Sequence, residues 1–159
     1  MCQAGTYNPT SVCNSAASCN NCDGGRYCST SGLSAVSGTC NEGYFCTSAA
    51  VYKYNDDAIA GGTGGHCKAG NFCPTGSSSQ QSCTPGKYCS EDYLSAVSGN
   101  CPERYYCLGG TSKERPTNNS TEGGNICPTG YYCPAGSTTP TACVAGTYQP
   151  NQGASASTD

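Results

Sequence analysis

The chain has 159 residues, of which only 12 are Leu, Ile, Val or Phe, and it contains no Trp. Burial contributes roughly 25 cal/mol per Å² of apolar surface, so these few side chains cannot offset the ordering entropy of a packed domain. Sixteen cysteines give instead the composition of a disulfide scaffold, which argues against a conventional enzyme fold. Seven Lys and Arg against ten Asp and Glu, with no basic cluster, exclude a nucleic-acid surface.

The cysteines indicate an extracellular setting, because thiols in the cytosol stay reduced. Structural zinc is the rival interpretation, but only Cys19 and Cys22 have metal-ligand spacing, and the single histidine, His66, is remote from them. Disulfides are therefore favoured over zinc, and we expect no cofactor other than covalent glycans. No stretch approaches the roughly 18 apolar residues of a membrane span, so this segment is not expected to insert into a membrane.

In chain order, the cysteine spacing predicts a partial repeat over residues 1–21, a six-cysteine unit over 22–82, a second over 83–142, and the start of a further, truncated repeat over 143–159. Residues 33–38 recur letter for letter as residues 94–99. The first residues after Met1 resemble those after Ala142, so both ends of the chain are expected to be cut points in a longer array. Such repetition predicts small disulfide-rich repeats in an elongated array, with little regular secondary structure and short β-hairpins.

A smaller motif, Cys-x-x-Gly-x-Tyr/Phe-Cys, occurs in each unit, with Arg104 in the glycine place of the copy between Cys101 and Cys107. Glycine permits a turn with positive φ just before an aromatic ring that can cover a disulfide. Packing on disulfides is therefore expected for Tyr27, Tyr44, Tyr88, Tyr106 and Tyr132. Tyr52, Tyr54 and Tyr93 lie off the motif and are candidates for contacts between molecules.

No catalytic residues are predicted. His66 adjoins Cys67, which the repeat assigns to a disulfide, so a free thiolate beside a base is absent, and an exposed loop histidine is the better interpretation. The acidic pairs lack the alternating oxygen ligands of a calcium loop. N-glycosylation is better founded: Asn118 and Asn119 are overlapping acceptors in the polar loop between Cys107 and Cys127, and sterics should allow a glycan on only one of them.

The stretch Cys2-Gln3-Ala4-Gly5-Thr6-Tyr7-Asn8-Pro9, followed by Cys19 and Cys22, resembles the GCC2/GCC3 (ephrin-receptor-like) cysteine-rich repeat, which is similar in style to tumour-necrosis-factor-receptor modules. Residues 94–107 and 127–137 resemble the arrays of such repeats in large secreted proteins of protists. The resemblance covers essentially the whole chain, with Arg104 and the extra Cys13 as departures. It implies an extracellular cysteine-rich array but no single role.

Disulfide pairing must survive a shift of six cysteines, and the simplest such scheme closes each long loop. It pairs Cys28 with Cys40, Cys46 with Cys67, Cys73 with Cys83, Cys89 with Cys101, Cys107 with Cys127, and Cys133 with Cys143, with on the order of 3 kcal/mol from each loop. The resemblance implies instead a Cys2–Cys19 pair, with Cys143 pairing elsewhere. Cys13 is then the candidate for a bond between chains.

These observations predict a structural extracellular protein, a subunit or segment of a disulfide-stapled glycoprotein filament or surface fibre similar to a ciliary hair (mastigoneme). Its expected partners are copies of itself or neighbouring repeats. The alternative is the cysteine-rich ectodomain of a receptor or adhesin that binds a protein or carbohydrate ligand. The divergence of the two long loops, residues 47–66 and 108–126, keeps this alternative open.

Overall fold

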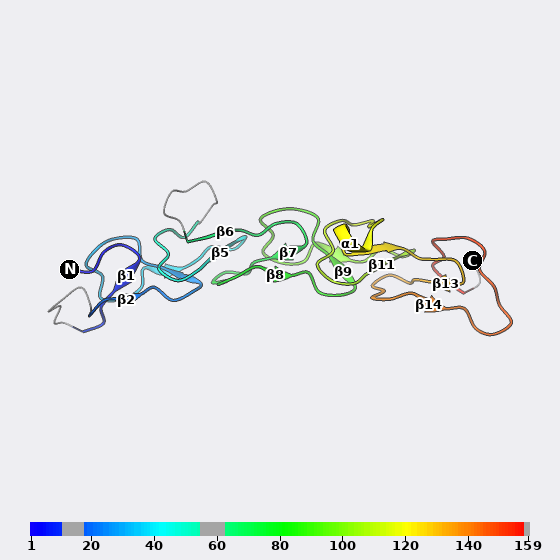
Figure 1. Cartoon of the computed structure of the whole chain (residues 1–159), viewed down its shortest axis with the longest axis horizontal. Helices are drawn as coiled ribbons and strands as arrows, with labels where there is room; N and C mark the ends of the chain where they lie inside the picture. Colours follow the sequence, from blue (N-terminus) through cyan, green and yellow to red (C-terminus); the bar gives the residue numbers. More distant parts are fainter. Residues whose placement is uncertain (11–17, 55–62, 158–159) are drawn as a thin grey trace. The chain divides into compact units, whose positions relative to one another are not determined.

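The computed structural model describes residues 1–10, 18–54 and 63–157. Short antiparallel hairpins make up nearly all of the regular structure in these residues, and one helical turn, α1 (Asn119–Glu122), is added to them (Figure 1). The prediction of small disulfide-rich repeats with short β-hairpins is confirmed. Cys13, proposed for a bond between chains, lies outside the described residues.

Each hairpin joins two strands of two or three residues. The pairs are β1 (Thr6–Tyr7) with β2 (Asn20–Asn21), β3 (Arg26–Tyr27) with β4 (Gly38–Thr39), β5 (Tyr44–Cys46) with β6 (Gly64–His66), β7 (Asn71–Phe72) with β8 (Gln81–Ser82), β9 (Lys87–Tyr88) with β10 (Gly99–Asn100), β11 (Tyr105–Cys107) with β12 (Gly124–Ile126), and β13 (Tyr131–Tyr132) with β14 (Thr141–Ala142).

The residue before each first strand explains why the strands are so short. In the seven-residue motif the glycine has positive φ, as at Gly25 (+82°) and Gly86 (+77°), so the chain turns sharply after the first cysteine. Two or three residues of strand then lead to the second cysteine. The turn and the disulfide confine the strand at both ends, and the remaining residues of the motif cannot extend the ladder.

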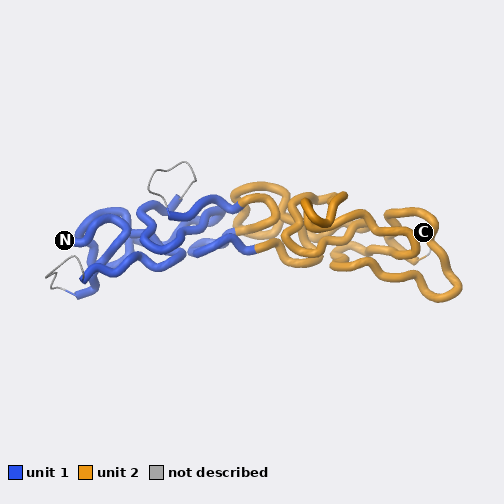
Figure 2. Tube along the Cα trace, viewed as in Figure 1, with its two compact units in different colours: residues 1–67, 73–81 blue, residues 68–72, 82–159 orange. Residues whose placement is uncertain are grey.

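The described residues fall into two compact units. The first comprises residues 1–67 and 73–81, and the second comprises residues 68–72 and 82–159 (Figure 2). Half-cystines form most of the interior of both: Cys22, Cys40, Cys83 and Cys101 are among those with at most 1 % of their surface exposed. Disulfides therefore occupy the interior positions that aliphatic side chains fill in an ordinary domain.

Six of the seven disulfides in the described residues join the two cysteines of one motif, so the prediction that they close the long loops is wrong. The bonds are Cys2–Cys19, Cys22–Cys28, Cys40–Cys46, Cys67–Cys73, Cys83–Cys89, Cys101–Cys107 and Cys127–Cys133. Cys143, which was expected to pair with Cys133, is a half-buried free cysteine. The Cys2–Cys19 pair is the one that the family resemblance implied.

The strand register explains the error. Arg26 lies opposite Thr39 and Tyr27 opposite Gly38, so a continuation of this ladder places Ser37, and not Cys40, across from Cys28. The turn brings the two cysteines of one motif close together instead, with Cα–Cα distances of 5.8–6.1 Å. Disulfides need Cα atoms within about 7 Å, and this geometric requirement overrides the larger entropy gain from a longer loop.

Candidate functional site

The feature that recurs through each unit is a backbone connection between successive motifs. In the first unit the Gly5 and Gly25 amides donate to the carbonyls of Cys28 and Cys46, each the second cysteine of the next motif, at 2.8 Å. The glycine carbonyls accept in turn from the first cysteine of that motif, as Cys40 donates to Gly25 at 2.9 Å. Each glycine position therefore holds the following motif by two main-chain hydrogen bonds.

The second unit repeats this pattern with the same geometry. Gly70 and Gly86 donate to the carbonyls of Cys89 and Cys107 at 2.8 Å, and their carbonyls accept from Cys83 and Cys101 at 2.8 Å. A Cβ atom at Gly86 would lie 2.5 Å from the Gly136 carbonyl oxygen, so a side chain there would collide with backbone. Close approach of the segment that follows Cys133, as well as positive φ, requires the glycine at this position.

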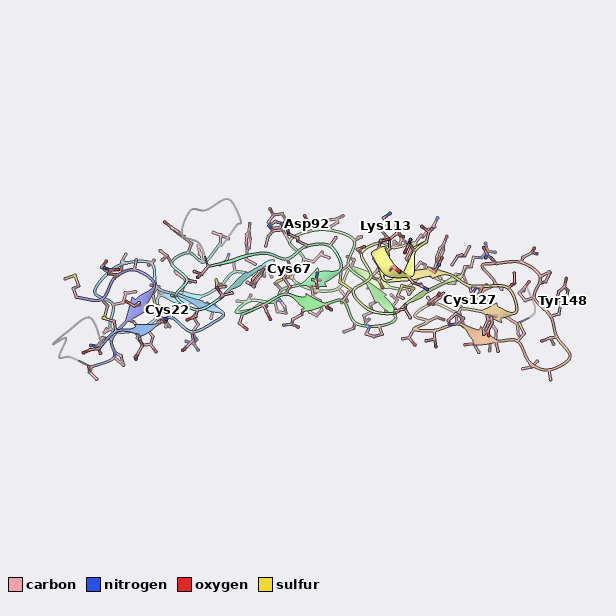
Figure 3. The ribbon with its side chains drawn as sticks, viewed as in Figure 1. Cys22, Cys67, Asp92, Lys113, Cys127 and Tyr148 are labelled. Carbon is pink, nitrogen blue, oxygen red and sulfur yellow. A yellow bond between two sulfur atoms is a disulfide. The ribbon has the colours of Figure 1, made fainter. Side chains whose placement is uncertain are left out.

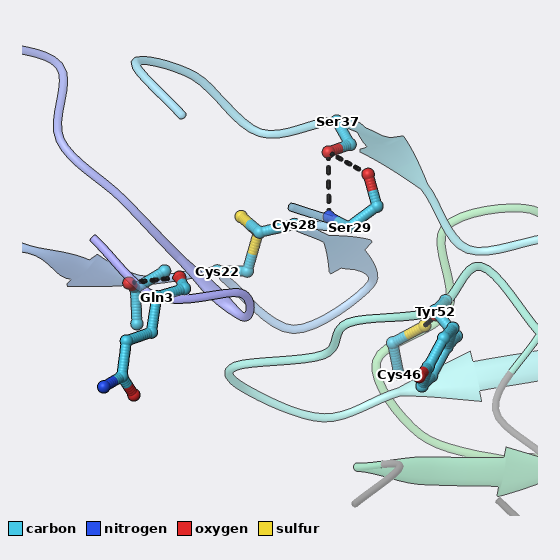
Figure 4. Close-up of a disulfide and its surroundings, with 8 residues drawn as sticks. Gln3, Cys22, Cys28, Ser29, Ser37, Cys46 and Tyr52 are labelled. Carbon is cyan, nitrogen blue, oxygen red and sulfur yellow. Dashed lines mark hydrogen bonds between the residues drawn. A yellow bond between two sulfur atoms is a disulfide. The ribbon is translucent and has the colours of Figure 1, made fainter. Parts of the chain in front are cut away.

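The identical hexapeptides occupy equivalent places in the two units. In the first, the Ser29 amide donates to the Ser37 hydroxyl at 3.0 Å, beside the Cys22–Cys28 disulfide (Figure 4). In the second, Ser90 donates to the Ser98 hydroxyl at 3.1 Å. The Ser37 amide also donates to the Tyr27 carbonyl, and the Ser98 amide to the Tyr88 carbonyl, both at 2.9 Å. The repeated sequence therefore closes the same turn twice.

Glycine ends each hexapeptide because a tyrosine ring covers it. A Cβ at Gly38 would lie 3.1 Å from the ring of Tyr27, and one at Gly99 would lie 3.1 Å from the ring of Tyr88. Tyr27 also packs against the cluster that contains Cys40 and Cys46. These contacts give Tyr27 and Tyr88 a structural role, and both side chains are half-buried.

The off-motif tyrosines are more exposed, with 44–47 % of the surface of Tyr52, Tyr54 and Tyr93 accessible. Tyr54 nevertheless has partners within the chain. Its ring lies edge-on to Tyr44 with 5.5 Å between centroids, and the Lys53 ammonium is 5.0 Å from its centre. Contacts of these tyrosines with other molecules stay a prediction.

The predicted glycan acceptors lie at the start of α1, and both are exposed. Asn118 is the N-cap: its Oδ1 accepts hydrogen bonds from the amides of Ser120 (2.9 Å) and Thr121 (3.2 Å). Asn119 instead donates its Nδ2 to the Tyr106 hydroxyl at 3.0 Å. The capping bonds occupy only the oxygen of the Asn118 amide, whereas the nitrogen of Asn119 is already engaged.

Glu122 links two other positions of the loop 108–126 to the end of α1. Its carboxylate pairs with Lys113, which Figure 3 labels beside α1, and accepts a 2.6 Å hydrogen bond from the Thr117 amide. The hydrogen bond from Lys113 is the main cause, and that from Thr117 the second, of a Glu122 pKa below its ordinary value of 4.5. This role was not predicted from the sequence, and Glu122 stands four residues after the N-cap Asn118, one position beyond the place of the acidic residue in a capping box.

His66 is half-buried in β6, opposite Tyr44, so the interpretation as an exposed loop histidine is wrong, because pairing with β5 holds this segment in a strand. Its neighbour Cys67 is bonded to Cys73. No free thiol therefore adjoins it. In the part of the chain that the structure describes, no group of three or more His, Cys, Asp or Glu side chains could hold a metal ion. The same residues contain no helix that is long and apolar enough to cross a membrane.

Compared with protein-family models and with curated proteins, the chain matches none. Its cysteine-rich repeat character therefore stands on the sequence and on the repeated bonds described above.

Proposed function

We propose that this chain is a structural extracellular protein, a segment of a disulfide-stapled filament or surface fibre. The observation that carries the proposal is the reciprocal pair of main-chain hydrogen bonds from each glycine position to the next motif. Main-chain bonds of this kind do not depend on side chains, so the sequence between motifs can vary while the connection is kept.

The disulfides within the motifs support the same role. A disulfide restricts each described motif from Cys22–Cys28 to Cys127–Cys133, and an internal bond limits how far a motif can extend when the chain is pulled or locally unfolds. Disulfide density of this order is typical of extracellular proteins. The similarity to GCC2/GCC3 arrays, and to mastigoneme-like fibres in particular, is part of the proposal.

The second candidate function is a receptor or adhesin ectodomain. It is favoured by the loop 108–126, which has its own helical turn, a capping asparagine and the Lys113–Glu122 ion pair. The structured, exposed loop of one repeat is the usual place for a binding site on a repeat scaffold.

Electron microscopy of the native material without reduction tests the proposal. Fibres with an axial period that matches the 61-residue shift between Leu33 and Leu94 are expected, and they should come apart after reduction. Dispersed short particles that bind a soluble ligand would overturn the filament function and favour the receptor or adhesin. A reduced and alkylated sample is the control.

A further inference from the structure

The second unit contains a cavity of about 290 Å³ lined by Pro102, Glu103, Arg104, Tyr105 and Arg115. We propose that this cavity binds the acidic group of a saccharide, a carboxylate or a sulfate. Two of the three arginines of the chain meet here, from two different segments. The inference goes beyond the proposed function and does not depend on whether the chain forms fibres.

Arg104 is in a place where the fold does not need a side chain. It stands in the glycine position of its motif, with φ +76°, against +79° for Gly43 at the equivalent position of the first repeat. Its backbone makes the usual two bonds, to Cys133 and from Cys127, both at 2.8 Å. A non-glycine residue at such a φ is strained, and strain of this kind is concentrated at functional sites.

Arg115 reaches the cavity from a segment that is held in place. It precedes Pro116, which restricts its backbone to extended conformations, and Pro116 is itself almost completely buried. The buried Thr111 donates its hydroxyl to the Gly123 carbonyl at 2.8 Å, and Glu122 pairs with Lys113. The loop is therefore ordered on both sides of Arg115.

The two guanidinium groups form no ion pair or hydrogen bond with the residues that the structure describes, so their donors remain for a ligand. Planar guanidinium groups suit carboxylate and sulfate oxygens because several N–H donors point the same way. Glu103 also lines the cavity and lowers its positive charge. A glutamate occurs at the same place of the first repeat, Glu42, so this carboxylate comes with the motif, and it can accept hydrogen bonds from sugar hydroxyls.

The other lining residues favour a sugar over an acidic peptide. Tyr105 and Pro102 are half-buried and offer flat apolar surface of the kind that packs against the C–H face of a sugar ring. The volume suits one ring with its acidic substituent and is small for a drug-sized ligand.

Binding of oligogalacturonate (carboxylate) and of a sulfated dextran fragment to the oxidised chain, measured by titration calorimetry at two salt concentrations, tests the proposal. Neutral dextran and oligoglutamate are the comparison probes. One acidic saccharide is expected to bind at least tenfold more tightly than either comparison probe, and more weakly at high salt. Which of the two binds more tightly identifies the acidic group.

Arg104→Gly and Arg115→Gln should each weaken this binding at least tenfold. Arg104→Gly restores the residue that Gly43 shows to be compatible with the fold, so loss of folding cannot explain its effect. Arg26→Gln, which removes the third arginine from the other unit, is the matched control and should bind like the unchanged chain. Unchanged binding in both cavity variants, an equal loss in Arg26→Gln, tighter binding of oligoglutamate, or no saccharide binding would each overturn the proposal.

Discussion

The hairpins β5–β6 and β11–β12 occupy the same place in the two repeats, and they share their backbone hydrogen bonds but not their side chains. Their registers are equivalent: Cys46 lies opposite Gly64, and Cys107 opposite Gly124. The chain also leaves both hairpins in the same way, because Thr47 donates to the Thr63 carbonyl at 3.0 Å and Leu108 to the Gly123 carbonyl at 2.8 Å.

The differences lie in side chains outside these bonds. Gly43 begins the first hairpin and Arg104 the second, and the loop of the second carries α1 and Arg115. A scaffold held by main-chain bonds and disulfides leaves its other side chains free to diverge. We infer that specialised chemistry in this chain belongs to the second repeat, and its common architecture to both.

The largest effect is expected from removal of an equivalent disulfide in either hairpin. Replacement of Cys40 and Cys46 together by serine, or of Cys101 and Cys107 together, should lower the free energy of unfolding by about 2–3 kcal/mol in each case, because both bonds close loops of the same length. Guanidinium unfolding of the two double variants measures this loss. A loss in one variant twice that in the other would show that the hairpins are not energetically equivalent.

A smaller effect is expected at the glycine place itself. Gly43→Ala should destabilise the chain by about 1 kcal/mol, because alanine is strained at a φ of +79°. Arg104→Gly should relieve that strain and stabilise the chain by up to about 1 kcal/mol, less what glycine loses in backbone entropy. Denaturation midpoints of the two variants should move in opposite directions, and a shift in the same direction would contradict the assigned strain.

The identical hexapeptides, residues 33–38 and 94–99, test whether the same hydrogen bond stabilises the same turn in both repeats. Ser37→Ala and Ser98→Ala each remove the hydroxyl that accepts from the amide of Ser29 or Ser90, and each should cost about 0.5–1 kcal/mol. Hydrogen exchange of those two amides should quicken in the respective variant alone. Protection that survives the loss of the hydroxyl would rule out this bond as the source of order in the turn.

The smallest effect concerns pH and is confined to the second loop. Because the pKa of Glu122 is lowered in the folded chain, its ion pair stabilises the loop at neutral pH, and this contribution falls as the pH drops below 4.5 through the folded-state value. NMR shifts of the Thr117 amide should follow this titration. Glu122→Gln should abolish the transition, and an unaltered titration in that variant would assign it to another group.

The fold class was predictable from the sequence because cysteine spacing and composition act locally. Five residues between the two cysteines of each motif, a glycine and an aromatic residue among them, and too few aliphatic side chains for a core predict short hairpins held by disulfides. The role of the repeated hexapeptide could not be predicted in the same way, since it depends on contacts between residues eight positions apart, such as Ser29 with Ser37. The capping role of Asn118 is local, because its oxygen accepts from amides two and three residues further on, but Asn118 was predicted only as a glycan acceptor.

Repetition, cysteine density and the positive-φ turns were thus determined by the sequence by itself, because each depends on residues within a few positions of one another. The disulfide partners were decided by tertiary structure. The cysteine spacing favoured bonds that close long loops, such as Cys28–Cys40. The strand register instead places Ser37 across from Cys28, and the turn of the motif brings Cys22 close to Cys28. The meeting of Arg104 and Arg115 was decided in the same way, since only the folded loop brings residues from two segments to one cavity.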